Sequence, residues 1–394
     1  MFRRDFLKTS GLLSLTPMVP GFVNSLARST PAETDQKILV VLELSGGNDG
    51  INTVVPFKDE LYTQVRPKLA LPENELLKIN DEMGLHRSMR TVKELFDDNQ
   101  FSIINGVGYP NPNRSHFESM AIWHRGLRDK KREGGEGWIG RAMDVSRVKG
   151  STDMDGYFVG RQAVAEAMLG RRAQVAALSR FKDLQLDKSV PATNLLQQQD
   201  DIAEFVQRQV TNSYATAKQI ESMAKQSSNA SEYPGNGLGQ QMRLVSQLIK
   251  SNSAARVYYT VQGGYDTHSA QANSHSSLLF SLSRALKAFV DDLKVSQLDD
   301  RVVVLVFSEF GRRVHENGSI GTDHGTAGPV FLAGTPVKGG LIGETTSLAD
   351  LQDGDIKVQY DFRQVYASLL DNWLGIDSTK VLEEKFEHLD LLSS

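Results

Sequence analysis

Apolar residues form five short runs along the chain in which no regular polar alternation occurs. These runs cover residues 37–44, 101–107, 256–261, 301–308 and 329–332. Continuous stretches of Val, Ile and Leu of this length are typical of strands that are covered on both faces, as in a parallel sheet. The pattern therefore predicts five buried strands.

Helical spacing of apolar residues appears between these runs, in residues 88–98, 276–293 and 365–374. Alternation of strand and helix predicts an α/β fold with a central, mostly parallel sheet flanked by helices and right-handed crossovers. Residues 160–250 are largely helical in pattern but polar, so the segment from about 125 to 250 is predicted to be a polar helical insertion or cap. We expect one domain over residues 28–394.

Composition narrows the class of protein. Hydrophobic residues make up 40% of the chain and charged residues 23%, as in ordinary globular proteins. The formal net charge of -4 gives no general reason to expect nucleic acid as a partner. The chain contains no cysteine, which excludes disulfides, thiolate metal sites and cysteine nucleophiles.

The first 27 residues have the pattern of an export signal. Arg3-Arg4-Asp5-Phe6-Leu7-Lys8 is followed by a short apolar stretch and by the small-residue site Ser25-Leu26-Ala27. Twin-arginine signals direct a chain to an export receptor and do not anchor it. We therefore expect residues 1–27 to be a twin-arginine signal peptide, with the Tat export machinery as partner. The remaining 367 of 394 residues are expected in the periplasm or outside the cell, without stable membrane insertion.

Acids, histidines, hydroxyls and glycines follow the predicted strands. In an open parallel sheet, ligands bind beyond the carboxyl ends of the strands, so these residues are predicted to meet at one edge. The segments concerned are residues 45–50, 108–116, 263–268 and 309–313, together with residues 321–325 just before the fifth strand.

Each segment has a structural and a functional interpretation. The glycines near Asp49 suit either a tight turn or close approach of the backbone to a metal. Asp266 and His268, like Asp323 and His324, form either a turn with a satisfied histidine or a ligand pair for a transition metal. Glu309 directly follows a Val-rich strand, and a buried acid there needs a partner. The remaining histidines lack such a setting and are interpreted as surface or structural residues: His86, His124, His275, His315 and His388.

Together the motifs resemble one family. They are residues 44–50 (LSGGNDG), 114–117 (RSHF), 264–268 (GYDTH), 308–312 (SEFGR) and 322–325 (TDHG), behind a twin-arginine leader. The chain resembles a family of exported bacterial proteins of unknown function that is grouped with the alkaline phosphatase and sulfatase superfamily. This resemblance covers nearly the whole mature chain. It implies an alkaline-phosphatase-like sheet and a metal site that acts on phosphate or sulfate esters.

The resemblance implies a ligand set of Asp49, Asp266, His268, Glu309 and His324, which Asp323 assists. These residues would hold one or two divalent cations, with zinc, manganese and calcium as the options. Two positions depart from the superfamily pattern, since Glu309 stands where it has Asp and Phe310 where it often has His or Asn. The loss of a histidine at Phe310 is consistent with a single ion.

The position of the nucleophile departs further. Alignment on Arg114 places the sulfatase nucleophile at Pro110, and alignment on His116 places the phosphomutase-type nucleophile at Pro112. Neither proline can attack an ester. The candidate catalytic residues are therefore Arg114, which would orient the anionic ester, together with Ser115 and His116. Ser115 or a metal-activated water would be the nucleophile.

Two functions follow from these residues. The first is an exported metal-dependent hydrolase of phosphate or sulfate esters. The second is a non-catalytic exported binding or assembly protein on a degenerate fold, which the two prolines favour. A nucleotide redox enzyme is not expected, because residues 46–50 depart from the G-x-G-x-x-G fingerprint.

Overall fold

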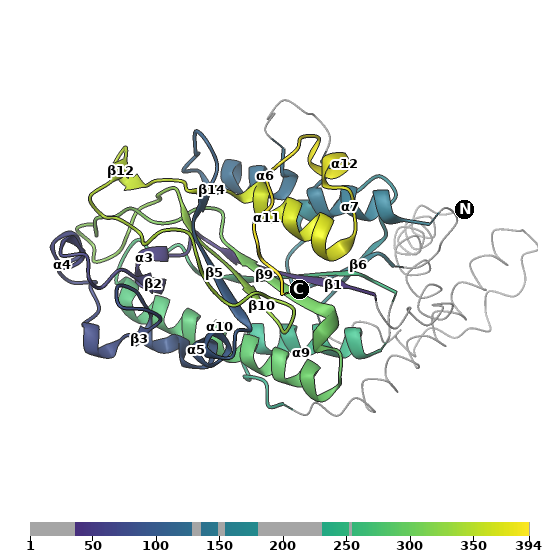
Figure 1. Ribbon diagram of the computed structural model, residues 1–394, viewed down its shortest axis with the longest axis horizontal. Helices are drawn as coiled ribbons and strands as arrows, with labels where there is room; N and C mark the ends of the chain where they lie inside the picture. The colour runs from purple at the N-terminus through teal and green to yellow at the C-terminus, as the bar shows by residue number, and fades with distance from the viewer. Residues whose placement is uncertain (1–35, 128–134, 149–153, 180–230, 252–253, 394) are drawn as a thin grey trace, which may run out of the picture.

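The computed structural model describes residues 36–127, 135–148, 154–179, 231–251 and 254–393 (Figure 1). The expected signal peptide, residues 1–27, lies outside them, as does much of the expected insertion. Among the described residues, no helix is both long and apolar enough to cross a membrane.

A nine-stranded sheet forms the centre of the molecule, in the order β11-β5-β10-β9-β1-β8-β6-β7, with β14 beside β5. Its strands are β1 (Ile38–Ser45), β5 (Phe101–Gly108), β6 (Gly156–Val159), β7 (Val175–Leu178), β8 (Val257–Gly263), β9 (Val302–Phe307), β10 (Gly328–Ala333), β11 (Gly340–Ile342) and β14 (Tyr360–Asp361). The five predicted strands are confirmed as β1, β5, β8, β9 and β10. The mixed α/β fold with a mostly parallel sheet is confirmed as well.

Strand β10 runs antiparallel to both of its neighbours, β5 and β9. All other strand pairs in this sheet are parallel. The chain entering β10 therefore lies at the same edge as the carboxyl ends of β1, β5, β8 and β9. This reversal brings residues 321–325 to the edge where the other polar segments end.

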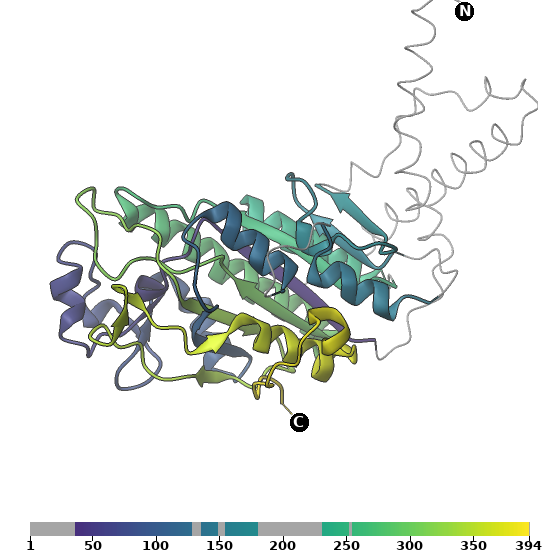
Figure 2. The same ribbon diagram turned by 90° about the horizontal axis from the view of Figure 1, so that it is seen from above.

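Helices cover both faces of the sheet, as Figures 1 and 2 show. On one face lie α5 (Arg90–Asp97), α9 (Gly237–Lys250) and α10 (Gln271–Val295); on the other lie α6 (His116–Arg125), α7 (Trp138–Ser146), α11 (Phe362–Ser368), the π-helix η7 (Leu369–Leu374) and α12 (Ser378–Leu382). Strand β1 is buried on both sides because Val40 and Leu42 pack into one core, whereas Leu39 and Val41 pack into the other. That two-sided burial is why its sequence lacks alternation.

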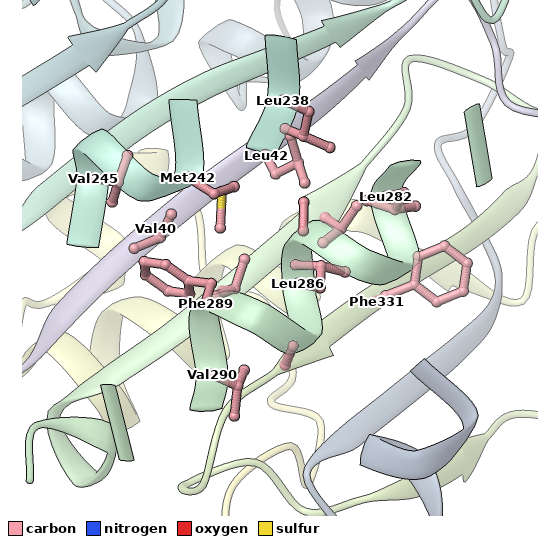
Figure 3. Packing of buried hydrophobic residues seen from close by; sticks show 14 of the residues in the cluster. Val40, Leu42, Leu238, Met242, Val245, Leu282, Leu286, Phe289, Val290 and Phe331 are labelled. Atoms are coloured by element: carbon pink, nitrogen blue, oxygen red, sulfur yellow. The ribbon is translucent and has the colours of Figure 1, made fainter. Parts of the chain in front are cut away.

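Figure 3 shows how α9 and α10 pack on the sheet. Met242 of α9 and Leu286 and Phe289 of α10 lie against Val40 of β1, and all four side chains are at most 1% exposed. Burying each of the larger side chains stabilises the fold by about 1.5–3 kcal/mol. The sheet edge is therefore held by a rigid scaffold.

Smaller elements complete the fold. They are the short helices α3 (Gly50–Thr53) and α4 (Leu61–Val65); the three-stranded sheet of β2 (Val54–Val55), β3 (Leu77–Lys78) and β4 (Gly84–Leu85); the hairpin of β12 (Leu351–Gln352) and β13 (Asp355–Ile356); and the 3₁₀ turns η1 (Glu73–Glu75), η2 (Arg87–Met89), η3 (Glu166–Met168) and η6 (Asp299–Arg301). The three-stranded sheet and the hairpin both lie at the edge of the molecule where α3 begins (Figure 1).

The segment expected to be a helical insertion differs from that expectation where the structure describes it. Residues 156–159 extend the central sheet as β6, which pairs in parallel with β8, and residues 175–178 extend it as β7, which pairs in parallel with β6. The intervening polar residues hid these two short strands, which are only four residues long. Residues 180–230 of the segment lie outside the described chain.

Candidate functional site

Three polar side chains meet at the carboxyl edge of the sheet. His116 begins α6, Asp266 follows β8, and His324 precedes β10. One ligand atom from each lies within 4.8 Å of the other two. His268 adds a further nitrogen, because its Nε2 atom lies 3.0 Å from Oδ1 of Asp266 and 2.9 Å from Nε2 of His324.

Helix α6 places His116 at this edge. Ser115 precedes the helix in an extended conformation, and Gly126 ends it in the left-handed conformation at φ 66°. Glu118 lies in the first turn and Arg125 in the last, as the helix dipole favours. This helix was not predicted from the sequence.

Every imidazole of the cluster is held at its Nδ1 atom by a group that only accepts hydrogen bonds. Nδ1 of His116 lies 2.7 Å from Oε1 of Glu309, and Nδ1 of His324 lies 2.7 Å from the carbonyl oxygen of Arg114. Nδ1 of His268 lies 3.0 Å from Oδ1 of Asp323. Each Nδ1 therefore carries the proton, and in the neutral ring Nε2 presents a lone pair.

These lone pairs converge on Oδ1 of Asp266. The Nε2 atoms of His116, His268 and His324 lie 3.3, 3.0 and 3.2 Å from it. Nε2 of His116 is buried and forms no hydrogen bond with the residues that the structure describes. Facing lone pairs are unfavourable unless a cation lies between them. A tetrahedral site with bonds of about 2.0–2.1 Å would separate its donors by about 3.3 Å. The donor atoms of His116, Asp266 and His324 all lie within 4.8 Å of one another, so these three residues suit a transition metal such as zinc.

The carboxylate that supports His116 belongs to a strand end. Glu309 follows β9 and is 1% exposed. It also accepts a hydrogen bond from the backbone N–H of Gly46, at 2.9 Å, and one from the hydroxyl of Ser308, at 3.0 Å. Glu309 therefore orients a histidine from behind, an arrangement that fixes the tautomer of metal-binding imidazoles and raises their basicity.

Phe310 closes one side of the cluster. Its ring centroid lies 4.9 Å from those of both His116 and His324. Gly47, at φ +73°, allows this packing, because a Cβ atom there would lie 2.3 Å from the Phe310 ring. Phe310, where the resemblance implies a His or Asn, therefore packs its ring against two imidazoles.

Charge and hydrogen bonding change the pKa values of His116 and Asp266. The hydrogen bond to Glu309 raises the pKa of His116. Burial opposes ionisation of Asp266, but the hydrogen bond and charge of Arg312 outweigh it and lower the pKa to about 2. Asp266 is therefore an anion at neutral pH, as a metal ligand must be.

Asp49 lies in a separate buried network. Its Oδ2 atom accepts a hydrogen bond from Arg66, at 2.5 Å, and another from Gln271. Oδ1 caps α3 through the N–H of Asn52. Burial would raise the pKa of Asp49, but the charge of Arg66 outweighs it and the pKa is lowered. The structure therefore places this expected ligand in a buried ion pair, apart from the histidine cluster.

Arg114 belongs to an ion-pair group beside the cluster. Its Nε atom lies 2.9 Å from Oδ2 of the fully buried Asp355, which Nη2 also contacts. Asp355 pairs with Arg313 too, at 3.0 Å. Two guanidinium groups share one carboxylate, so this rim keeps a net positive charge, and the side chain of Arg114 is 43% exposed.

Ser115 lies between two residues that take part in the cluster. The carbonyl group of Arg114 accepts a hydrogen bond from His324, and His116 is one of the candidate metal ligands. Ser115 is exposed at the N-terminus of α6, where its side chain makes no capping hydrogen bond. The unpaired N–H groups of a helix's first turn attract anions. An anionic ester bound there would lie near this hydroxyl.

The structure thus brings together His116, Asp266, His268 and His324, with Glu309 and Asp323 behind two of the rings. Sequence reasoning assigned no role to Arg66, Gln271, Arg312 or Asp355, although Arg312 lies in the SEFGR motif. The remaining histidines lie outside the cluster. His86, His124 and His275 are buried, and His315 and His388 are exposed.

Comparisons with known proteins add a family and a set of distant structural neighbours. A family model described as "Protein of unknown function (DUF1501)" matches residues 36–386. No curated protein matches the chain.

Several solved structures share part of the arrangement. The zinc complex of the C-terminal periplasmic domain of EcEptC from Escherichia coli is 9% identical, with a TM-score of 0.43 over 87% of this chain and 84% of that one. The PsFucS1 sulfatase from Pseudoalteromonas sp. is 10% identical, with a TM-score of 0.41 over 90% and 71%. An alkaline phosphatase superfamily protein from Vibrio parahaemolyticus is 12% identical, with a TM-score of 0.38 over 91% and 71%.

Proposed function

The chain belongs to the DUF1501 family, and we propose that it is a metal-dependent hydrolase of phosphate or sulfate esters. The observation that carries the proposal is the convergence of three Nε2 atoms on one oxygen of Asp266, at 3.0–3.3 Å. Each ring is anchored at Nδ1, so Nε2 is the atom that each ring offers to an ion. A divalent cation held by His116, Asp266 and His324 would lie between donor atoms that are within 4.8 Å of one another.

The site residues divide into ligands and supports. His116, Asp266, His268 and His324 would hold the ion, while Glu309 and Asp323 orient two of the imidazoles. A bound divalent ion would supply a Lewis acid and activate an oxygen nucleophile. Zinc or manganese suits a donor set of three imidazoles and one carboxylate better than calcium does, because calcium prefers oxygen ligands only.

Charge around the cluster favours an anionic substrate. Arg114 and Arg313 together outweigh the single carboxylate of Asp355. The pairing of Arg114 with Asp355 uses Nε and Nη2 and does not involve Nη1. The positive end of the α6 dipole adds to the same field. A phosphate or sulfate group would therefore bind between Arg114 and the first turn of α6.

Ser115 carries a hydroxyl group and lies directly between Arg114 and His116 in the sequence. In the proposed reaction its Oγ atom attacks the phosphorus or sulfur atom, the ester oxygen leaves with a proton, and water then releases the acid and regenerates the serine. The alternative nucleophile is water itself. The variant S115A separates the two, because activity through water survives the substitution.

Metal content and hydrolysis test the proposal together. Purified full-length protein is expected to bind a divalent cation in a zinc or manganese titration, and to hydrolyse p-nitrophenyl phosphate or p-nitrophenyl sulfate. The variant H324A is expected to lose both properties. H315A is the matched control, because His315 is an exposed histidine of the same loop. Absence of metal binding in the wild-type protein would overturn the proposal.

Retained metal without any ester hydrolysis would instead favour the second function, a non-catalytic binding or assembly protein. The observation behind this alternative is that Asp355 already pairs with Arg114. A mobility or pull-down assay with and without chelator then reports whether the metal supports a partner complex.

We also propose that the protein is exported by the twin-arginine pathway to the periplasm or beyond, on the basis of Arg3 and Arg4. Replacing both arginines with lysine is expected to leave the protein in the cytoplasm. Unchanged export of that variant would contradict the proposed route.

A further inference from the structure

Arg312 is a buried cation in direct contact with the shared ligand. Its side chain is fully buried, and its Nη2 atom donates to Oδ1 of Asp266 at 2.7 Å. The other hydrogen bonds of the guanidinium go to backbone carbonyl groups, those of Gly46, Gly47, Tyr265 and Thr322. An arginine cannot be deprotonated in a protein, so a fixed positive charge lies behind Asp266.

The oxygen that Arg312 contacts is the one that the three histidines approach. Oδ1 of Asp266 therefore has three imidazole nitrogens and one guanidinium nitrogen within 3.3 Å. In two-metal centres, the second ion lies about 3.5–4 Å from the first and shares a ligand with it. Here the shared oxygen already has the guanidinium group of Arg312 beside it, at 2.7 Å.

Asp49, a buried acid beyond the end of β1, is also paired with an arginine. Asp49 pairs with Arg66, and both side chains are fully buried. Arg66 is held in turn by the carbonyl groups of Arg313 and Val314. Asp49 therefore has a permanent counter-charge and is not available to hold a second ion.

We infer that the centre takes one divalent cation per chain, and that Arg312 supplies the fixed positive charge that a second ion would otherwise provide. The inference rests on the proposed metal site and adds its stoichiometry. Arg312 is a positioning residue, since it contacts a ligand of the ion and is sealed from solvent by four backbone carbonyl groups.

The charge of Arg312 has a second consequence. A positive charge beside a ligand oxygen repels the incoming cation, so it weakens metal binding even while it orients the carboxylate. Loss of the charge and loss of the hydrogen bonds therefore act in opposite directions on metal affinity. A purely structural arginine would show only the second effect.

The first test is stoichiometry. Zinc is titrated calorimetrically into metal-free wild-type protein, and bound zinc is counted by elemental analysis after dialysis, with H324A as the baseline for adventitious sites. We expect one ion per chain above that baseline. Two ions would overturn the inference and leave the proposed function intact, whereas no ions would overturn the proposed function itself.

The second test isolates the charge. R312Q and R312K both lose most of the hydrogen bonds to the backbone, but only R312K keeps a positive charge. We expect R312Q to bind zinc about tenfold more tightly than R312K, or to bind a second ion, because the repulsive charge is gone. Equal affinity and stoichiometry in the two variants would overturn the role of Arg312. If neither variant folds, the wild-type stoichiometry still decides the first part of the inference.

Discussion

Nδ1 of His116 lies 2.7 Å from Oε1 of Glu309, and this contact joins the first residue of α6 to the end of β9. The carboxylate accepts a second hydrogen bond from the N–H of Gly46, at 2.9 Å. Because Glu309 is buried, its charge is not screened by water. The carboxylate therefore makes Nε2, the other ring nitrogen of His116, a better ligand for a cation.

The variant E309Q is expected to weaken zinc affinity by about 10–100-fold, the usual effect of removing a carboxylate behind a metal-binding imidazole. Gln keeps the size of the side chain, so the fold is expected to remain. Competition with a fluorescent zinc chelator measures the change. E316Q provides a control from the following loop, because the Glu316 carboxylate accepts hydrogen bonds from the backbone N–H groups of Lys68 and Leu69, away from the histidine cluster. Equal zinc affinity in E309Q and E316Q would remove Glu309 from the site.

Asp49 and Arg66 are predicted to contribute to stability and not to metal binding. D49N leaves the guanidinium of Arg66 buried without a counter-charge, which typically costs about 3–5 kcal/mol. The double variant D49N/R66M removes the charge as well and is expected to be more stable than D49N alone. Urea unfolding followed by circular dichroism measures both. Unfolding of D49N within about 1 kcal/mol of the wild type would show that the pair is dispensable.

His275 is predicted to make stability depend on pH. Its ring is buried in α10 beside Asn48, and burial, opposed by Asp49 and reinforced by Arg66 and Arg312, lowers its pKa to about 4. The unfolded chain has a histidine pKa near 6.5 and takes up the proton first. The stabilising effect of the neutral ring is therefore complete above about pH 6.5 and is lost as the pH falls towards 4.

From pH 7 to pH 5 this residue is expected to lower the free energy of unfolding by about 2 kcal/mol. Comparison with H275N isolates the effect, since all other titrating groups are shared. The variant is expected to be less stable at pH 7 but to lose less stability on acidification. Parallel pH dependence in the two proteins would contradict the assignment.

The fold was largely predictable from the sequence. Residues such as Val40 and Leu42 alternate with Leu39 and Val41 between two cores, so the run lacks polar positions and indicates a strand covered on both faces. Strands β6 and β7 were missed because each has four residues and lies among polar segments. Helix α6 was missed because its N-terminal residues resemble the end of a polar loop.

The site was predictable only in part. Position next to the end of a strand indicated where Asp266, His268 and His324 would lie, and the structure has these three side chains close together at the sheet edge. Position alone does not distinguish a metal ligand from a neighbouring acid, such as Asp49, that forms an ion pair with an arginine. Arg66 lies 17 residues after Asp49 in sequence, and the pairing depends on a long-range fold of the chain that no local pattern encodes. Glu309 likewise faces His116 across 193 residues.

Arg114 is predicted to act through two separate groups. Its carbonyl oxygen holds His324, whereas its guanidinium group lies on the exposed rim and would contact the substrate anion. R114Q changes only the side chain. We therefore expect the variant to bind zinc as the wild type does, and to show a KM for the anionic ester raised about tenfold or more, since hydrogen bonds to a charged group contribute about 1.5–3 kcal/mol.

R313Q is the matched control for this prediction. Arg313 pairs with the same carboxylate of Asp355 and has similar exposure, at 37% against 43% for Arg114. Removal of either arginine lowers the charge of the rim by the same amount. If Arg114 contacts the substrate directly, steady-state kinetics will show a much larger rise in KM for R114Q than for R313Q. A similar rise in both would show that the rim attracts the ester only through its overall charge.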